Sequence, residues 1–383
     1  MEINHQVLWL WAKDCLGYNN KKLLRAVEFF GSIEELYQSD DYAQCEFLLD
    51  KEVKLLNKKN LRLAWETYGL CEENQIGILT LDDGMYPPLL REISNPPCPL
   101  FFKGHLRSCL NAPLLTIVGT RKHNGYGEAM TKELTVPLCC CGFTIVTGLA
   151  GLDTVACKSA LESDGRVVAV LPFGILANSG HSTVRFKQIL AKGALISEYF
   201  PKTKTQRHSY HERNRILSGI SHGTVVVQAP QRSGALMTAN YALEQNRDLF
   251  ALMANADATS AGSNRLIKDG CCYPITDYVD ILQVYLPRFA DRLKEVTDPA
   301  EKVFSLRDEL NEKKVNEFKK KHMKGLTPEE QAVFSLLSTD ECTTDYLIEH
   351  AGLPVHEVLQ SLTTLEFRGL AVSCPGSKFK VIL

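Results

Sequence analysis

The residues best suited to chemistry in this chain surround a glycine turn. Residues 114–118 are apolar apart from one threonine and lead into Gly119, Thr120 and Arg121, and a helical pattern starts near residue 126. A strand, a glycine turn and a helix N-terminus together make an anion site, because free backbone N–H groups and the helix dipole point at the same spot. A hydroxyl and a guanidinium beside such a turn suit phosphate, so the turn predicts phosphate binding.

Three further polar clusters repeat this pattern downstream, at 147–148 (Thr-Gly), 213–215 (Arg-Asn-Arg) and 233–234 (Ser-Gly). Two arginines at the start of a helix repel its dipole unless an anion bridges them. Pairing with Glu212 and Glu198 is the alternative for these arginines. Lys158, on the next predicted helix, points either to the same edge or into solvent. The candidate ligand-contacting residues are Gly119, Thr120, Arg121, Gly148, Lys158, Arg213, Asn214, Arg215, Ser233 and Gly234.

The groups that a catalytic site requires are missing from the sequence. There is no G-x-S-x-G nucleophile turn and no G-x-x-x-x-G-K-[ST] phosphate loop, so no catalytic residue is assigned. The turn at residues 119–125 lacks the G-x-G-x-x-G spacing of a dinucleotide site, which disfavours NAD. His208 and His211 lie three residues apart without an obvious third ligand, so we expect no metal and no cofactor.

Composition indicates an ordinary globular protein. The 383 residues are 45% hydrophobic and 23% charged, and no apolar run approaches the length of about 18 residues that a membrane span requires. Residues 1–5 do not start a signal peptide, so we expect a cytoplasmic protein. The 13 cysteines include adjacent groups at 139–141 and 271–272 and no C-x-x-C pair, which favours reduced thiols over zinc.

Charge is distributed unevenly along the chain. The net charge is −2, but residues 116–285 hold 17 Lys and Arg against 13 Asp and Glu, whereas residues 326–383 hold 3 against 8. These two regions present different surfaces to partners. The centre is too weakly basic for diffuse nucleic-acid binding, so any such binding depends on a few placed residues.

The elements that position these residues alternate between strands and helices. Apolar runs predict strands at 114–118, 143–147, 166–171, 193–197, 223–228 and 248–252, and the segments between them have helical patterns. This order is typical of an α/β fold with a Rossmann-like parallel sheet and helices on both faces. Ligands of such sheets bind at the carboxyl ends of the strands, where the glycine turns fall.

The flanking regions predict further domains. Residues 1–75 read as short helices of a SAM-like or helix-hairpin-helix-like domain, and 76–113 as a connecting segment with a short strand at 100–104. The Rossmann-like domain spans 114–287 and a charged linker 288–325. Residues 326–383 start with a capping box at Thr327 and continue with three helices and two short strands, the pattern of a winged helix.

The order of these motifs resembles the DprA/Smf family, the bacterial DNA-processing proteins of natural transformation. The resemblance rests on VGTRKHNGYG, TGLAGLD, ISEYFP, YHERNRILSGIS, SGALMTANYALEQNRDLFA and SAGSNRLIKDG over residues 114–285, and upstream on TLDDGMYPPLL and NPPCPLFFKG. The ordered set is specific, although each motif alone is weak. The chain departs from the family pattern at Cys157, where the family has His, at Gln228, where it has Glu, and in a turn at 148–153 that is one residue shorter.

The resemblance implies a homodimer that binds single-stranded DNA and helps to load the RecA recombinase. It implies DNA contacts for the candidate residues given above and a dimer interface around Asn264, Leu266 and Ile267. A few well-placed cations suffice for single-strand binding. The acidic C-terminal domain is poorly suited to reading duplex DNA, so we expect it to face a protein.

Two other functions remain open. A nucleotide hydrolase that cleaves a base from ribose phosphate uses a similar scaffold, but it needs a P-G-G-x-G-T turn and a nearby glutamate. Glu198 is the one well-placed carboxylate for that role. A transcriptional regulator would use the winged helix on duplex DNA, which the acidity of residues 326–383 disfavours.

Overall fold

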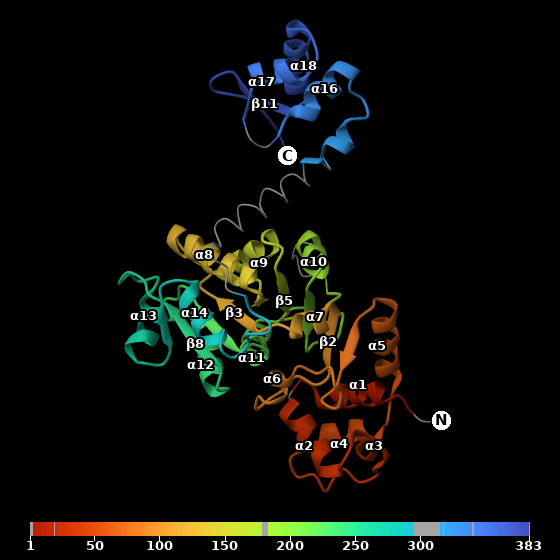
Figure 1. Cartoon of the computed structure of the whole chain (residues 1–383). Coiled ribbons are helices and arrows are strands. Elements are labelled where there is room, and N and C mark those ends of the chain that lie inside the picture. Colours follow the sequence, from red (N-terminus) through yellow and green to blue (C-terminus); the bar gives the residue numbers. More distant parts are fainter. Residues whose placement is uncertain are drawn as a thin grey trace. The chain divides into compact units, whose positions relative to one another are not determined.

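The computed structural model describes residues 3–18, 20–177, 183–294, 315–316, 318–338 and 341–382. The chain divides into two compact units, Met1–Pro299 and Ala300–Leu383 (Figure 1). The first unit contains the predicted helical, connecting and Rossmann-like segments together. The second contains the predicted winged helix. Of the predicted charged linker, residues 295–314 and 317 lie outside the described residues.

The described residues of the first unit form a sheet in the order β1-β2-β6-β5-β4-β3-β7-β8-β9. Strands β3 to β9 pair in parallel, and β2 pairs antiparallel with β1 and β6. The strands are β1 (Gly77–Leu79), β2 (Leu100–Gly104), β3 (Leu114–Val118), β4 (Thr144–Thr147), β5 (Arg166–Val170), β6 (Ala194–Ser197), β7 (Gly223–Val226), β8 (Asp248–Leu252) and β9 (Tyr273–Ile275). The six predicted parallel strands are confirmed as β3 to β8. The predicted strand at 100–104 is β2, whereas β1 and β9 are additions to the prediction, because three residues each carry too little pattern to recognise.

The strand order reverses at β3. The chain builds the sheet outward from β3 through β4, β5 and β6, and then returns to the other side of β3 with β7, β8 and β9. Leu115 of β3 pairs with Ile145 of β4 on one side and with Gly223 of β7 on the other. The crevice at the carboxyl ends of β3 and β7 is therefore the switch point, where open parallel sheets bind their ligands.

Helices cover both faces of the sheet, as the α/β prediction requires (Figure 1). One core cluster includes apolar residues of α8, α9, α10 and α14, and the other those of α6, α7, α11 and α12. These helices are α6 (Pro88–Arg91), α7 (Leu106–Leu110), α8 (Gly125–Cys141), α9 (Leu152–Glu162), α10 (Thr183–Leu190), α11 (Ser209–Ile220), α12 (Gly234–Glu244), α13 (Ala261–Lys268) and α14 (Tyr278–Tyr285). Burial of the strands from both sides explains their nearly continuous apolar sequences.

The N-terminal helices pack into the same core as the sheet. They are α1 (His5–Leu16), α2 (Asn20–Phe30), α3 (Ile33–Gln38), α4 (Asp50–Asn57) and α5 (Arg62–Glu73). A buried polar network joins them to the sheet domain. Lys13 Nζ donates to Asn20 Oδ1 at 2.9 Å, and Asn20 Nδ2 donates to Glu198 Oε2 at 3.1 Å. Burial lowers the pKa of Lys13 to about 8. The helical segment is thus fixed to the end of β6 through hydrogen bonds as well as through apolar contacts.

The second unit has a core of its own. Its helices are α16 (Pro328–Leu336), α17 (Thr344–His350) and α18 (Val355–Phe367), and its strands are β10 (Cys342–Thr343), β11 (Ala371–Cys374) and β12 (Lys378–Val381). The predicted capping box is confirmed, since Thr327 Oγ1 accepts from the amide of Glu330 and the Glu330 carboxylate accepts from the amide of Thr327. Three helices and a small antiparallel sheet in the order β10-β12-β11 confirm the winged helix.

Candidate functional site

A cavity of about 430 Å³ opens at the switch point of the sheet. It lies between the turn after β3, the start of α9, the N-terminal half of α11 and the start of α12. Its lining is rich in arginine and contains a single carboxylate. The lining residues are Val118, Gly119, Thr120, Arg121, Ala150, Asp153, Arg207, Tyr210, His211, Arg213, Asn214, Arg232, Ser233, Gly234, Ala235 and Thr238. The structure therefore brings together most of the residues that the four polar clusters of the sequence predict.

The turn after β3 does not offer its first amides to a ligand. The amide of Gly119 donates to Asp153 Oδ1 at 3.2 Å, and that of Thr120 donates to the carbonyl oxygen of Gln228 at 2.8 Å. The prediction of free backbone N–H groups at Gly119 and Thr120 is wrong for this reason. Gly119 is instead required by packing, because a Cβ there would lie 2.6 Å from a methyl carbon of Leu152. These two amides are therefore not available to a ligand, and the arginines of the lining are the main candidates for anion contact.

Asp153 and Arg213 form the floor of the cavity. Arg213 is 3% exposed, and its Nη1 donates to the carbonyl oxygen of Val170 at 2.8 Å. Burial lowers the pKa of Arg213 to about 10, and the neighbouring Asp153 opposes that shift. Burial also raises the pKa of Asp153 to about 6, against the effects of Arg213 and of the Gly119 amide. Gly148 packs directly on this arginine, since a Cβ at Gly148 would lie 2.2 Å from Arg213 Nη1.

Three further arginines line the rim. Arg121, Arg207 and Arg232 are exposed, and none of them has an ion-pair partner within the described part of the chain. The Arg121 guanidinium lies over the ring of Tyr210, with its carbon 5.0 Å from the ring centroid. Stacking of this kind orients the guanidinium without neutralising it. The rim therefore presents uncompensated positive charge above a floor in which charge is nearly balanced.

The start of α12 forms the opposite wall. Ser233 is the N-cap of α12, and its Oγ accepts from the amide of Ala235 at 3.3 Å. Asn214 reaches across from α11, and its Nδ2 donates to the carbonyl oxygen of Gly234 at 3.3 Å. Gly234 is exposed, and a Cβ there would meet nothing within 4 Å. Unlike Gly119 and Gly148, Gly234 is not required by the packing of the protein.

Three predicted contact residues do not line the cavity: Gly148, which packs on Arg213, and Arg215 and Lys158, which lie elsewhere. Arg215 is 6% exposed, and its Nη2 lies 2.5 Å from Glu198 Oε2 in a buried ion pair. Arg215 lines a separate cavity of about 380 Å³. Arg213 and Arg215 are two residues apart on one helix, so their side chains point in different directions and do not share one site. Lys158 lies on the exposed side of α9, where its Nζ is 3.7 Å from Glu162 Oε1.

Two of the three departures from the family pattern, at Gln228 and Cys157, have structural roles. Gln228 is fully buried, and its Nε2 donates to Asn124 Oδ1 at 3.1 Å and to Thr259 Oγ1 at 3.0 Å. It therefore holds the N-cap of α8 against the loop that precedes α13. Cys157 is fully buried in the core of the sheet domain, where burial raises the pKa of its thiol to about 12. Neither side chain lines the cavity.

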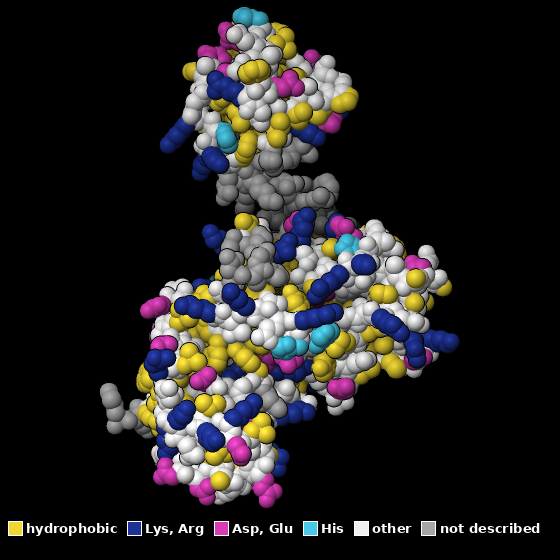
Figure 2. Space-filling view, turned by 180° about the vertical axis from the view of Figure 1, so that it is seen from behind, with side chains coloured by type: hydrophobic (Ala, Val, Ile, Leu, Met, Phe, Trp, Pro, Cys, Tyr) yellow, Lys and Arg dark blue, Asp and Glu magenta, His cyan; other side chains and the backbone are white. Residues whose placement is uncertain are grey.

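The cavity also contains four residues that the sequence did not predict as contacts, namely Arg207, Tyr210, His211 and Arg232. A usable signal was present, because Arg207 to His211 is a run of basic and aromatic residues just before the Arg-Asn-Arg triplet. Such mixtures mark single-strand binding surfaces. Figure 2 shows Lys and Arg side chains interspersed with hydrophobic ones over one face of the first unit.

Metal binding and membrane insertion find no support in the part of the chain that the structure describes. It contains no group of three or more His, Cys, Asp and Glu side chains arranged around a potential metal site. None of its helices combines the length and the apolar composition that crossing a bilayer requires.

Comparison with known proteins identifies the family of the chain. Residues 77–286 match the family model of DNA recombination-mediator protein A, and residues 321–377 match the DprA winged helix domain. Protein Smf of Synechocystis is 29% identical, and the match covers 99% of this chain and all of that protein. Protein Smf of Escherichia coli is 33% identical over 80% of this chain and 78% of its own length.

A solved structure extends this agreement to the fold. DNA processing protein A of Streptococcus pneumoniae is 27% identical and superposes with a TM-score of 0.58, over 74% of this chain and 98% of that chain. The family model covers more than half of the chain, and its match contains every residue that lines the switch-point cavity. The chain therefore belongs to the DprA/Smf family of DNA-processing proteins.

Proposed function

We propose that this protein binds single-stranded DNA at the switch-point cavity and passes it to a RecA-type recombinase. The observation that carries the proposal is the rim of exposed Arg121, Arg207 and Arg232 above a cavity whose lining contains one buried carboxylate. The exposed arginines of the rim attract phosphates, whereas the buried charges of Asp153 and Arg213 largely offset each other. Tyr210 and His211 add flat ring faces on which bases can stack.

The geometry favours a single strand over a small nucleotide or a duplex. Cations and rings line one edge of the sheet, an arrangement that follows a flexible backbone of phosphates and unstacked bases. The family assignment to DNA processing and recombination agrees with DNA as the ligand.

A non-enzymatic role is part of the proposal. Glu198, the carboxylate that a nucleotide hydrolase would need, is 1% exposed and paired with Arg215 and Asn20. Asp153, the carboxylate that does line the cavity, is held by the Gly119 amide and faces Arg213. Glu198 does not line the cavity, and one oxygen of Asp153 is already engaged by the protein. Release of free base from a nucleoside monophosphate, measured chromatographically, would overturn this part.

Dimerisation through the region of α13 is a further part of the proposal. Leu266 and Ile267 are only partly buried, and Tyr273 on the edge strand β9 is 50% exposed. Asn264 stabilises the region from within, because its Nδ2 donates to the carbonyl oxygens of Ala254 and Asn255 at 3.0 and 3.1 Å. An apolar edge of this kind suits a second copy, and a dimer would place two arginine rims on one DNA strand.

The test is fluorescence anisotropy of a labelled oligo-dT strand over a salt series. We expect Arg121→Ala to weaken binding by about tenfold, since a hydrogen bond to a charged group contributes about 1.5–3 kcal/mol. Three phosphate contacts give an expected log–log salt slope of about −2 per protomer. The matched control is Arg62→Ala, which removes the same charge from an exposed position on α5.

Equal affinities of wild type, Arg121→Ala and Arg62→Ala would exclude the cavity as the binding site. A duplex competitor as effective as the single strand would contradict the preference for single strands. Recombinase loading is tested separately, by the lag of RecA filament formation on single strands covered with single-strand-binding protein. A lag that this protein does not shorten would contradict that part of the proposal.

A further inference from the structure

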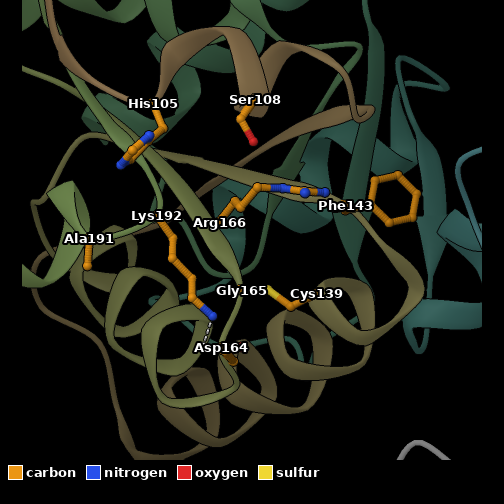
Figure 3. A pocket seen from close by; sticks show the side chains of 9 residues that line it. All are labelled: His105, Ser108, Cys139, Phe143, Asp164, Gly165, Arg166, Ala191 and Lys192. Carbon is orange, nitrogen blue, oxygen red and sulfur yellow. Dashed lines mark hydrogen bonds and ion pairs between the residues drawn. The ribbon is translucent and has the colours of Figure 1, made fainter.

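A second cavity lies at the other end of the strands of the same sheet, away from the switch-point cavity. Its volume is about 510 Å³, within the range of about 300–1,000 Å³ that is usual for small-ligand sites. Its residues precede or start strands β4, β5 and β6, so it lies at their amino ends. Figure 3 shows its lining residues: His105, Ser108, Cys139, Phe143, Asp164, Gly165, Arg166, Ala191 and Lys192. Nothing in the proposed DNA-binding function uses this cavity.

The Arg166 side chain extends across this cavity, between Ser108 on one side and Cys139 on the other (Figure 3). Its guanidinium is poorly satisfied by the described residues of the protein. Nε is buried and has no hydrogen-bond partner, and Nη2 makes one long contact of 3.4 Å with the carbonyl oxygen of Gly142. A buried donor without an acceptor costs free energy, and an acceptor bound in the cavity would relieve that cost.

The charge of Arg166 is also left without a counter-ion among the lining residues. Asp164 is the one carboxylate in the lining, and it forms an ion pair with Lys192 (Figure 3). Burial raises the pKa of the Cys139 thiol to about 12, so this thiol stays neutral and does not balance the arginine. A partly buried cation without a partner is costly, and an anion in the cavity would relieve that cost.

We propose that this cavity is a second anion site, which binds the phosphate group of a small phosphorylated ligand on the Arg166 guanidinium. The guanidinium fork fits two oxygens of one phosphate. The hydroxyl of Ser108 can donate to a further oxygen, and the ring of His105 lies in the same lining. The remaining volume takes the rest of a ligand the size of a mononucleotide.

The experiment is isothermal titration of the full-length protein with inorganic phosphate and, separately, with dTMP. Both are titrated into Arg121→Ala, because phosphate also suits the switch-point cavity. We expect binding to persist in Arg121→Ala, and adding Arg166→Gln to weaken it by at least about tenfold. Tighter binding of dTMP than of phosphate would show that the nucleoside part also enters the cavity, and equal affinities that the phosphate alone is recognised.

Two further variants show whether a loss of phosphate binding in Arg166→Gln comes from the site itself or from misfolding. Ser108→Ala changes an exposed hydroxyl of the lining and is expected to weaken phosphate binding severalfold without altering the thermal melt. Arg107→Gln is the matched control, because Arg107 is exposed on the same helix but does not line the cavity. Loss of phosphate binding in Ser108→Ala but not in Arg107→Gln supports the site even if Arg166→Gln misfolds.

The proposal is overturned if Arg121→Ala alone abolishes phosphate binding, or if Ser108→Ala and Arg166→Gln bind phosphate as well as Arg107→Gln does. Single-strand affinity is measured in parallel. Arg166→Gln is expected to leave this affinity unchanged, because the two cavities lie at opposite ends of the strands. A failure of the DNA-binding proposal would thus be visible separately from a failure of this one.

Discussion

The Asp153 carboxylate accepts a hydrogen bond from the amide of Gly119 at 3.2 Å, so a buried acid of the protein itself occupies the first amide after β3. In many Rossmann-like sheets a ligand phosphate contacts this turn. Here Asp153 ties the turn to α9 and faces Arg213. The unpaired positive charge of the cavity is therefore displaced outward, to the arginines of the rim.

The first prediction concerns pH. The folded protein raises the pKa of Asp153 from 3.8 to about 6, mainly through burial. A carboxyl group with a raised pKa binds protons more readily in the folded than in the unfolded chain, so its contribution to stability falls as the pH rises from about 4 to about 6. Protonation also removes the one negative charge of the cavity, so DNA affinity should rise as the pH falls through 6.

The variant Asp153→Asn checks this assignment. Anisotropy titrations between pH 5 and 8 should show a weaker pH dependence in Asp153→Asn than in wild type. His211 lines the same cavity, so His211→Gln is measured in parallel. An undiminished pH dependence in Asp153→Asn would show that another group is responsible.

The second prediction contrasts Gly148, which packs on Arg213, with Gly234, which lines the cavity. A Cβ at Gly148 would collide with Arg213 Nη1 at 2.2 Å, whereas a Cβ at Gly234 would meet nothing. We expect Gly148→Ala to destabilise the fold by about 1–3 kcal/mol, the usual cost of overpacking. Gly234→Ala should leave the free energy of unfolding within about 0.5 kcal/mol of wild type but weaken DNA binding, because Gly234 lies in the proposed DNA site. Urea denaturation and anisotropy measure the two effects, and unchanged DNA affinity in Gly234→Ala would contradict a role of Gly234 in that site.

The third prediction concerns the buried ion pair of Glu198 and Arg215. Removing one partner of a buried pair leaves an uncompensated charge, so Glu198→Gln should cost about 3–5 kcal/mol of stability. The double variant Glu198→Leu with Arg215→Met should be more stable than Glu198→Gln, because neither residue of the former pair is then charged. Urea denaturation followed by tryptophan fluorescence reports the change, since Trp9 and Trp11 lie in the buried helix α1. A loss below about 1 kcal/mol in Glu198→Gln would mean that the pair is effectively solvated.

The fourth prediction tests the proposed dimer. Ile267→Asp places a charge on the partly apolar outer side of α13 and should halve the molar mass measured by light scattering. Single-strand affinity should fall with it, because one protomer offers half of the cations. Arg62→Gln, which changes the net charge equally at a distant exposed position, should keep the wild-type mass. A wild type that is already monomeric at micromolar concentration would refute the dimer.

The fifth prediction concerns the winged helix. The second unit folds around its own core, and residues 326–383 carry 8 acidic against 3 basic residues. Deleting residues 326–383 should therefore leave single-strand affinity within about tenfold of the full chain, since an acidic domain adds little to phosphate binding. A larger loss on deletion would assign the winged helix a direct part in holding DNA.

The sequence by itself determined the layers of the fold and the edge at which the site lies. Apolar runs separated by helical patterns specify a parallel sheet, and the position of Gly119 after β3 specifies the edge, because both depend on local periodicity and turn chemistry. The winged helix was recognisable for the same reason, through the capping box at Thr327 and the helix lengths.

Tertiary structure alone decided which side chains share the site. Arg213 and Arg215 are nearly adjacent in sequence, yet the helix sends the first to the cavity floor and the second to Glu198. Asp153 takes up the Gly119 amide, and Arg207 and Arg232 converge on one rim from two separate loops. Hydrogen-bond partners and burial depend on contacts between distant segments, which periodicity along the chain does not encode.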